Sequence, residues 1–106
     1  MSFVKLSAPA NADLARLYDF LAKYNHEVAA QGLTKILDAI DSLETQPFQG
    51  APVEDRPFVR KLVITWGASG YLIFHKYNEQ TDTVQISRII NQREDYSPIT
   101  IGIESK

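Results

Sequence analysis

The chain has no cysteine, only two histidines and no apolar run long enough to span a membrane. The absence of thiols excludes disulfides, thiolate zinc sites and a cysteine nucleophile, and it is typical of proteins in a reducing compartment. A membrane-spanning helix needs roughly 20 consecutive apolar residues, and the first residues also lack the apolar segment of a signal peptide. We therefore expect a cytoplasmic protein with no membrane partner.

The chain also lacks the basic excess that is usual in proteins whose affinity rests on phosphate contacts. Its formal net charge is −2, from 11 Lys and Arg against 13 Asp and Glu. Residues 54–96 are relatively more basic than residues 1–53, and most of the arginines lie there. The second half is therefore where an anionic partner would be expected to bind.

Two helical patterns occupy the first half of the chain. Apolar residues recur at spacings of three and four from Leu14 to Tyr24, and again from Ala29 to Leu43. Ser7 or Asn11 is expected to cap the first helix, and Asn25 the second. Because the break between the helices is short, they should pack as an antiparallel hairpin.

Glycine at position 32 stands inside the second helical pattern, where it costs about 1 kcal/mol relative to alanine. Close approach of the two helix backbones would explain its presence. Before the helices, the apolar-rich stretch Phe3–Leu6 predicts an edge strand.

The second half changes to the composition of a β-sheet. Gln46–Pro57 contains three prolines and a glycine and predicts a connecting loop. Three stretches rich in β-branched and aromatic residues then predict strands joined by short turns; these stretches are Phe58–Trp66, Tyr71–Tyr77 and Thr83–Ile90. The turns between them are Gly67–Gly70 and Asn78–Asp82, and such short connections predict an antiparallel meander.

These elements predict an α+β fold of the order β-α-α-β-β-β in a single domain, residues 1–106. The helical hairpin should pack on one face of an antiparallel sheet, because both helical stripes need an apolar partner, and the other face should be partly open. Residues 97–106 form a C-terminal tail that we expect to be ordered by a partner.

No strong catalytic motif is present, neither a glycine-rich phosphate loop nor a zinc-protease helix motif. His26 and His75 lie in different predicted elements without the spacing of metal ligands. We expect no metal site and no cofactor.

The basic residues of the predicted strands are candidate contacts for a partner. Side chains alternate along a strand, so Arg60 and Lys61 should point to opposite faces. Because alternate residues share a face, His75 is expected on the same face of its strand as Ile73, and Arg88 on the same face as Val84, Ile86 and Ile90. Long basic side chains often extend to solvent at sheet ends without a functional role, and that interpretation stands beside the functional one.

Arg93 and Tyr96 follow the last predicted strand and are three residues apart. Arginine grips phosphate or carboxylate groups through its planar fork, and tyrosine can stack on a base or donate a proton. The alternative is a solvated turn in which Arg93 pairs weakly with Glu94 or Asp95. The residues alone leave these two interpretations equal.

From Phe3 to Tyr96, the chain resembles the RelE/ParE superfamily of toxins from bacterial type II toxin–antitoxin systems. The order and spacing of several segments carry the resemblance, rather than any single motif. The segments are Ala12–Leu21, Val59–Leu62 with Gly70–Phe74, and Val84–Glu94.

The resemblance implies the fold read above and a cognate antitoxin that binds the toxin in a hetero-oligomer. ParE-like members inhibit DNA gyrase by protein–protein contact, whereas RelE-like members cut mRNA on the ribosome. Leu72 stands where RelE-like proteins carry arginine, and Asn91 stands where they often carry histidine. The acidic net charge also fits ribosome binding poorly. The ParE-like branch, which would not be an enzyme, is therefore favoured.

Two other hypotheses remain beside a gyrase inhibitor. The first is a RelE-like, metal-independent endoribonuclease that acts on mRNA in the ribosome and uses Arg60, Arg93 and Tyr96 as catalytic residues. The second is an inactive family member that is bound by its antitoxin. Residues expected to contact the target or a partner are Lys61, His75, Arg88 and Arg93. The antitoxin is expected to bind in a groove between helices and sheet.

Overall fold

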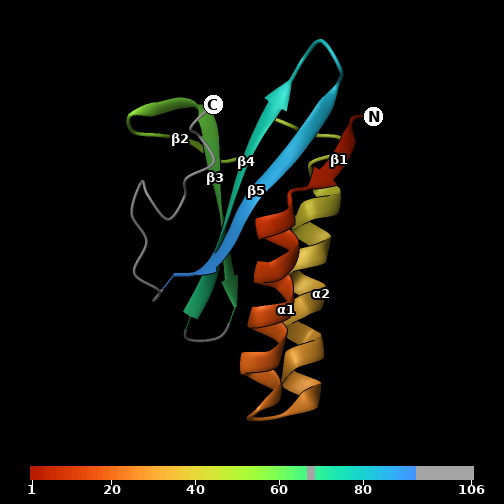
Figure 1. Ribbon diagram of the computed structural model, residues 1–106, viewed down its shortest axis with the longest axis vertical. Coiled ribbons are helices and arrows are strands. Elements are labelled where there is room, and N and C mark those ends of the chain that lie inside the picture. Colours follow the sequence, from red (N-terminus) through yellow and green to blue (C-terminus); the bar gives the residue numbers. More distant parts are fainter. Residues whose placement is uncertain (67–68, 93–106) are drawn as a thin grey trace.

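The computed structural model describes residues 1–66 and 69–92 of the chain. In this part, two helices lie against one face of a five-stranded sheet (Figure 1). The elements are β1 (Phe3–Leu6), α1 (Ala8–Ala22), α2 (His26–Ser42), β2 (Ala51–Val53), β3 (Arg56–Trp66), β4 (Ser69–Asn78) and β5 (Thr83–Asn91). The strand order is β1-β5-β4-β3-β2. The predicted α+β class, with a helical hairpin on one sheet face, is confirmed.

The two helices begin at side-chain caps that the sequence indicated. The Ser7 hydroxyl accepts a hydrogen bond of 3.1 Å from the Ala10 amide, so Ser7 rather than Asn11 caps α1. The Asn25 side chain accepts hydrogen bonds of 2.7 and 3.2 Å from the Glu27 and Val28 amides at the start of α2. Each cap satisfies amide groups that have no partner inside the helix.

The main core lies between the helix pair and the sheet. Its buried members include Leu17, Ile36, Ile40, Ile73 and Ile89. These side chains fill the space in which the sequence predicted an antitoxin groove, so in the described residues that space is packed core rather than a binding groove.

Gly32 lies where side chains, rather than two helix backbones, come close. A Cβ atom at this position would stand 2.9 Å from Leu21 Cδ1 and 3.2 Å from the ring of Trp66. Residues of α1 and β3 therefore meet over this glycine, which corrects the expectation of a direct approach between helix backbones.

β2 is a short strand inside the segment that was predicted to be loop. It pairs antiparallel with the first half of β3, which begins two residues earlier than predicted. Pro52 is compatible with this position because a strand at the edge of a sheet does not need every amide for pairing. Gly50 and Asp55, at φ angles of 90° and 70°, make the turns on either side of β2.

The sheet is mixed rather than wholly antiparallel, because β1 pairs parallel with β5 while the other neighbours are antiparallel. The helical hairpin returns the chain to the start of β1, where the Ser2 amide donates a hydrogen bond of 2.6 Å to the Glu44 carbonyl, and the loop after α2 then leads to β2 at the other edge (Figure 1). In the described part of the chain, no helix is long and apolar enough to cross a membrane.

A bulge in β5 reverses the alternation of its side chains. Phe74 pairs with Arg88 and His75 pairs with Ile86, which leaves Ser87 without an opposite residue. Arg88 and Ile90 therefore lie on the face opposite to Ile86, and their predicted placement on one face with Ile86 is wrong. The Ser7 hydroxyl donates a hydrogen bond of 2.9 Å to the Ser87 carbonyl and so joins the start of α1 to the bulge.

Candidate functional site

β3 and β4 separate toward one end of the sheet and form a groove. Their pairing ends at Arg60 and His75, while β4 continues along β5 as far as the pair of Asn78 and Thr83. Beyond this point, β3 pairs with β2 instead, so two hairpins diverge (Figure 1). The space between them has a volume of about 1000 Å³.

The groove has an excess of positive charge in a chain that is acidic overall. Its charged lining residues are Lys5, Arg56, Arg60 and Lys76 against Asp55 and Glu79. Aromatic side chains share the lining, namely Phe48, Phe58 and Tyr77. Of these nine charged and aromatic residues, the sequence singled out Arg60 alone, because only the tertiary fold brings β1, β3 and β4 to one groove.

Lys5 and Lys76 lie in one row across the sheet. Lys5 pairs with Gln85, and Gln85 pairs with Lys76 on its other side. Since neighbouring strands are about 4.8 Å apart, the two lysine backbones stand roughly 10 Å apart on one face. Within residues 1–66 and 69–92, no carboxylate is close enough to either ammonium group to form an ion pair.

Arg60 and His75 are brought together, and both hold the loop that follows α2. The Arg60 guanidinium donates a hydrogen bond of 3.0 Å to the Gly50 carbonyl and lies 5.4 Å from the centre of the Phe48 ring. His75 Nε2 is 3.0 Å from the Gln49 carbonyl oxygen. That contact requires the proton on Nε2, because a carbonyl oxygen can only accept.

His75 is completely buried, so a direct contact with a partner would require this loop to move. Burial lowers the pKa of His75, the hydrogen bond to the Gln49 carbonyl partly opposes this, and the charge of Arg60 lowers the pKa further. The ring is therefore neutral at pH 7. Its Nδ1 atom is buried and has no hydrogen-bond partner in the described part of the chain.

Lys61 and Arg88 lie on the face away from the helices, separated by one strand. Lys61 pairs with Phe74, and Phe74 pairs with Arg88. This row contains none of the residues of the Arg60–His75 pair, which faces the opposite side of the sheet. The structure therefore distributes the predicted contact residues over two faces.

Asp13 binds Arg88 at the boundary between α1 and β5. Its two carboxylate oxygens accept hydrogen bonds of 2.7 and 2.9 Å from Nε and a terminal nitrogen of Arg88. A third hydrogen bond, of 2.8 Å, comes from the Ile89 amide. β1 ends at Leu6, so in the described chain no strand pairs with the outer edge of β5 here, and the Asp13 carboxylate takes that place.

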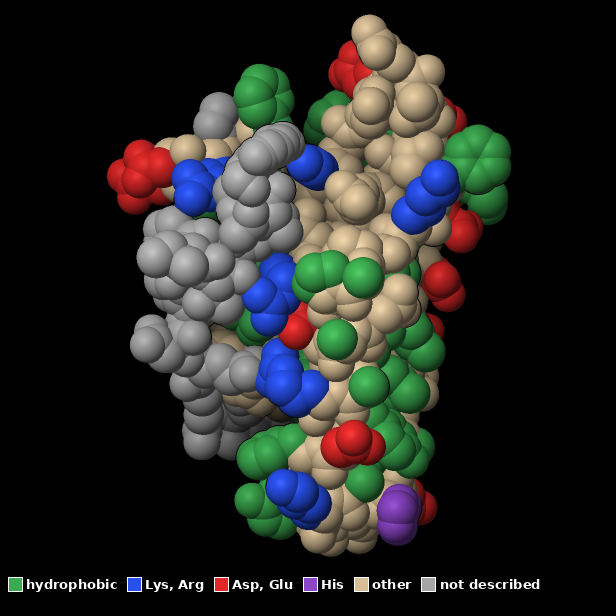
Figure 2. All heavy atoms as spheres, viewed as in Figure 1, with side chains coloured by type: hydrophobic (Ala, Val, Ile, Leu, Met, Phe, Trp, Pro, Cys, Tyr) green, Lys and Arg blue, Asp and Glu red, His purple; other side chains and the backbone are tan. Residues whose placement is uncertain are grey.

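The environment of Asp13 favours its charged form. Burial raises the pKa of this carboxyl, but the hydrogen bonds from Arg88, Ile89 and Arg16 outweigh burial, and the pKa lies below its ordinary value. Basic side chains gather along the line where α1 meets the sheet (Figure 2). Asp13 was not predicted from the sequence, although its spacing of four from Leu17 and eight from Leu21 places it on the apolar stripe of α1.

Comparison with known proteins now identifies the family. The model of the ParE toxin of the type II toxin–antitoxin system parDE matches residues 4–96. The chain belongs to this family. The predicted resemblance to the RelE/ParE superfamily is thereby confirmed, and the chain is a toxin of the type II class. No curated protein sequence matches it significantly.

Two solved structures share the fold of this ParE-family toxin. A chain of the chromosomal ParDE toxin–antitoxin system from P. aeruginosa is 26% identical, with a TM-score of 0.68 over 85% of this chain and 95% of that one. A chain of the RelBE2 toxin–antitoxin complex from Mycobacterium tuberculosis is 17% identical, with a TM-score of 0.62 over 86% and 98% of the two chains.

An apolar strip occupies the sheet face away from the helices in this ParE-family toxin. Val59, Leu72, Phe74 and Ile90 are buried there together, with Val53 of β2 packed against them. Leu72 is the position at which the resemblance to RelE-like proteins predicts an arginine. In this chain, the centre of that face therefore carries buried aliphatic and aromatic side chains.

The remaining predicted site residues, Arg93 and Tyr96, lie outside the described residues. The described residues also contain no cluster of three or more His, Asp or Glu side chains that could hold a metal ion.

Proposed function

We propose that this ParE-family toxin inhibits DNA gyrase by protein–protein contact and acts in the cytoplasm. The observation that carries the proposal is the apolar strip around Leu72, because cutting an RNA chain requires charge stabilisation at the scissile phosphate. Arg88, which borders this strip, is held by Asp13. A contact with a protein surface does not require a free cation at this position.

Two assays on the same protein separate the possible targets. The full-length chain is added to purified gyrase, and the rate of DNA supercoiling is measured; the chain is also induced in cells, followed by assays for the DNA-damage response and for mRNA cleavage. Loss of supercoiling with a DNA-damage response supports the proposal. Cleaved mRNA with unaffected supercoiling would contradict it.

We further propose that a cognate antitoxin binds the toxin as a hetero-oligomer; the similar solved structures come from the ParDE toxin–antitoxin system and the RelBE2 toxin–antitoxin complex. Phe20 and Tyr24, packed edge to face at the free end of the helical hairpin, are 50% and 75% exposed and offer apolar area to a partner. The chain is co-expressed with the protein encoded beside it and analysed by size exclusion. Separate elution of the two proteins would contradict the proposal.

One observation favours the ribonuclease as a second candidate function. Arg60 lines the basic groove together with Lys5 and Lys76. With Arg93 and Tyr96, it would form the catalytic set predicted for RNA cleavage. Cleavage of mRNA that disappears in Tyr96→Phe would establish this candidate. If induction causes neither mRNA cleavage nor loss of supercoiling, the chain is the inactive, antitoxin-bound family member.

A further inference from the structure

The groove between the two diverging hairpins combines unpaired lysines with exposed aromatic rings. Lys5 and Lys76 approach from β1 and β4, and neither forms an ion pair within the described part of the chain. Their backbones are roughly 10 Å apart, and the exposed Lys5 and half-buried Lys76 repel each other weakly through water and salt. An anion bound between them would remove this repulsion.

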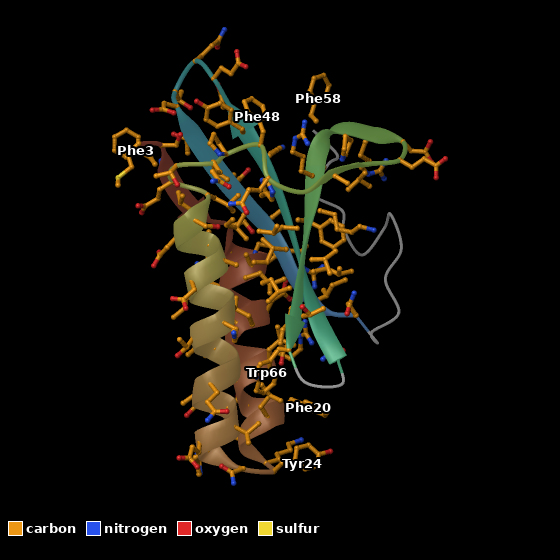
Figure 3. The ribbon with its side chains drawn as sticks, turned by 180° about the vertical axis from the view of Figure 1, so that it is seen from behind. Phe3, Phe20, Tyr24, Phe48, Phe58 and Trp66 are labelled. Atoms are coloured by element: carbon orange, nitrogen blue, oxygen red, sulfur yellow. The ribbon has the colours of Figure 1, made fainter. Side chains whose placement is uncertain are left out.

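The aromatic rings lie at the same end of the molecule as the lysines. Phe58 in β3 and Phe48 in the loop after α2 both line the groove, far from the Trp66 end of the sheet (Figure 3). Phe58 is 84% exposed, although a ring of this size normally buries most of its surface. Phe48 is already engaged by Arg60 and by Tyr77. Phe58 is therefore the ring that a ligand can cover.

We propose that this groove binds single-stranded DNA, with Lys5 and Lys76 contacting its phosphates and a base stacking on Phe58. Cations that follow a phosphate backbone beside aromatic rings that receive bases are the combination used for single strands. The groove lies beyond the pair of Arg60 and His75 and borders the apolar strip around Leu72 at Val59, which belongs to both. This binding goes beyond gyrase inhibition, and only the choice of DNA over RNA rests on that proposed function.

The aromatic as well as the basic side chains of the groove favour a single strand as its occupant. An acidic peptide would satisfy the lysines but would leave Phe58 without a matching planar group. A duplex would satisfy the lysines too, yet its bases are stacked on each other and cannot cover a ring. Asp55 and Glu79 line the groove and would repel an anion, so the phosphates should lie at the lysine row.

The test measures fluorescence anisotropy of a labelled 12-nucleotide thymidine oligomer with the full-length chain, in salt from 50 to 200 mM. The variant Lys5→Gln/Lys76→Gln is compared with the matched control Lys23→Gln/Lys35→Gln, which removes two exposed charges from the helices. Each neutralised phosphate contributes about 0.7 to the salt slope for a single strand, so the groove variant should lower the slope by about 1.4 and the control by none. Phe58→Ala should weaken binding about tenfold.

Thermal melting of each variant verifies that it is folded. Equal loss of affinity in the groove variant and the helix control would overturn the proposal, as would unchanged binding in Phe58→Ala. Tighter binding of the matching uridine RNA would overturn the assignment to DNA. Binding of a 12-residue glutamate peptide in place of the oligomer would assign the groove to a protein partner instead. Because the assay contains no gyrase, its failure is distinguishable from failure of the gyrase proposal.

Discussion

Asp13 and Arg88 are 75 positions apart in the chain, yet the carboxylate of one holds the guanidinium of the other through two short hydrogen bonds. The Asp13 side chain is only 4% exposed and that of Arg88 is 19% exposed. The pair fixes the first helix to the last strand and satisfies the Ile89 amide at an open sheet edge. The pair therefore couples the packing of α1 to the position of the last strand.

Replacing Asp13 by asparagine should destabilise the domain by about 3 kcal/mol, because Arg88 would keep its charge while losing the carboxylate that compensates its burial. Urea unfolding at pH 7 measures the change. Asp19→Asn, on an exposed position of the same helix, is the control and should change stability by less than about 0.5 kcal/mol. Equal stability of the two variants would show that the pair contributes nothing.

The difference in unfolding free energy between the wild type and Asp13→Asn should depend on pH. The pKa of Asp13 in the folded chain lies below the ordinary value of 3.8, so its contribution is fully present above that pH. The contribution is lost as the pH falls from 3.8 through the lower pKa of the folded state. An unfolding series from pH 6 to pH 2 should show the two curves converging only at the acidic end.

His75 should make the domain less stable in mild acid. Its pKa is lowered in the folded chain, chiefly by burial, so below pH 6.5 the unfolded chain takes up a proton that the folded chain does not. The contribution of His75 to the free energy of unfolding is thus fully present above pH 6.5, and it is lost as the pH falls through the lower pKa of the folded state. Urea unfolding at pH 7.5 and 5.5 should show a smaller pH effect in His75→Gln than in the wild type. The exposed His26→Gln should retain the full effect.

Two glycine-to-alanine substitutions should differ sharply in outcome. Gly50 has a φ angle of 90°, and a Cβ there would collide with the backbone carbonyl of Lys61, so Gly50→Ala should cost about 2–3 kcal/mol. At Gly32, the methyl group would displace a flexible end of Leu21 and press on the ring of Trp66, while the helix gains about 1 kcal/mol from alanine, so the two effects offset each other. Gly32→Ala should therefore change the urea midpoint little. A larger loss at position 32 than at position 50 would contradict both assignments.

Arg93→Ala should relieve growth arrest when the toxin is induced, while the melting temperature stays unchanged. A charge-assisted contact with a target is worth roughly 1.5–3 kcal/mol, whereas loss of a surface side chain rarely changes stability by more than about 0.5 kcal/mol. Tyr96→Phe should leave a gyrase inhibitor nearly intact and weaken an RNA cleaver that needs the hydroxyl. Full toxicity of Arg93→Ala would remove this residue from the site and make Arg60 and Arg88 the next candidates.

The parts of the fold that depend on local patterns could be predicted from the sequence. The spacing of Leu14 to Tyr24 marked α1, Asn25 marked the start of α2, and runs of β-branched residues marked three strands. β2 was missed because a three-residue edge strand containing Pro52 has no periodicity of its own. This segment is a strand because it pairs with β3, and its composition alone does not indicate one.

The candidate site could be predicted only in part, because it depends on register and on contacts between distant segments. Lys5 and Lys76 are unremarkable in sequence and become neighbours of the same Gln85 only when β1, β4 and β5 are aligned. Arg88 was recognised as a candidate, but Asp13 as its partner was not. No local pattern reports which carboxylate an arginine will meet 75 residues away.

Ser87 also determines how this chain must be aligned with others. Upstream of it, even-numbered residues of β5 such as Ile86 face the helices; downstream, odd-numbered ones such as Ile89 do. A relative without this extra residue matches both halves of the strand only if one position is skipped in the alignment. Matching it without a gap would exchange Arg88 for a core residue and assign the wrong side chain to every position that follows.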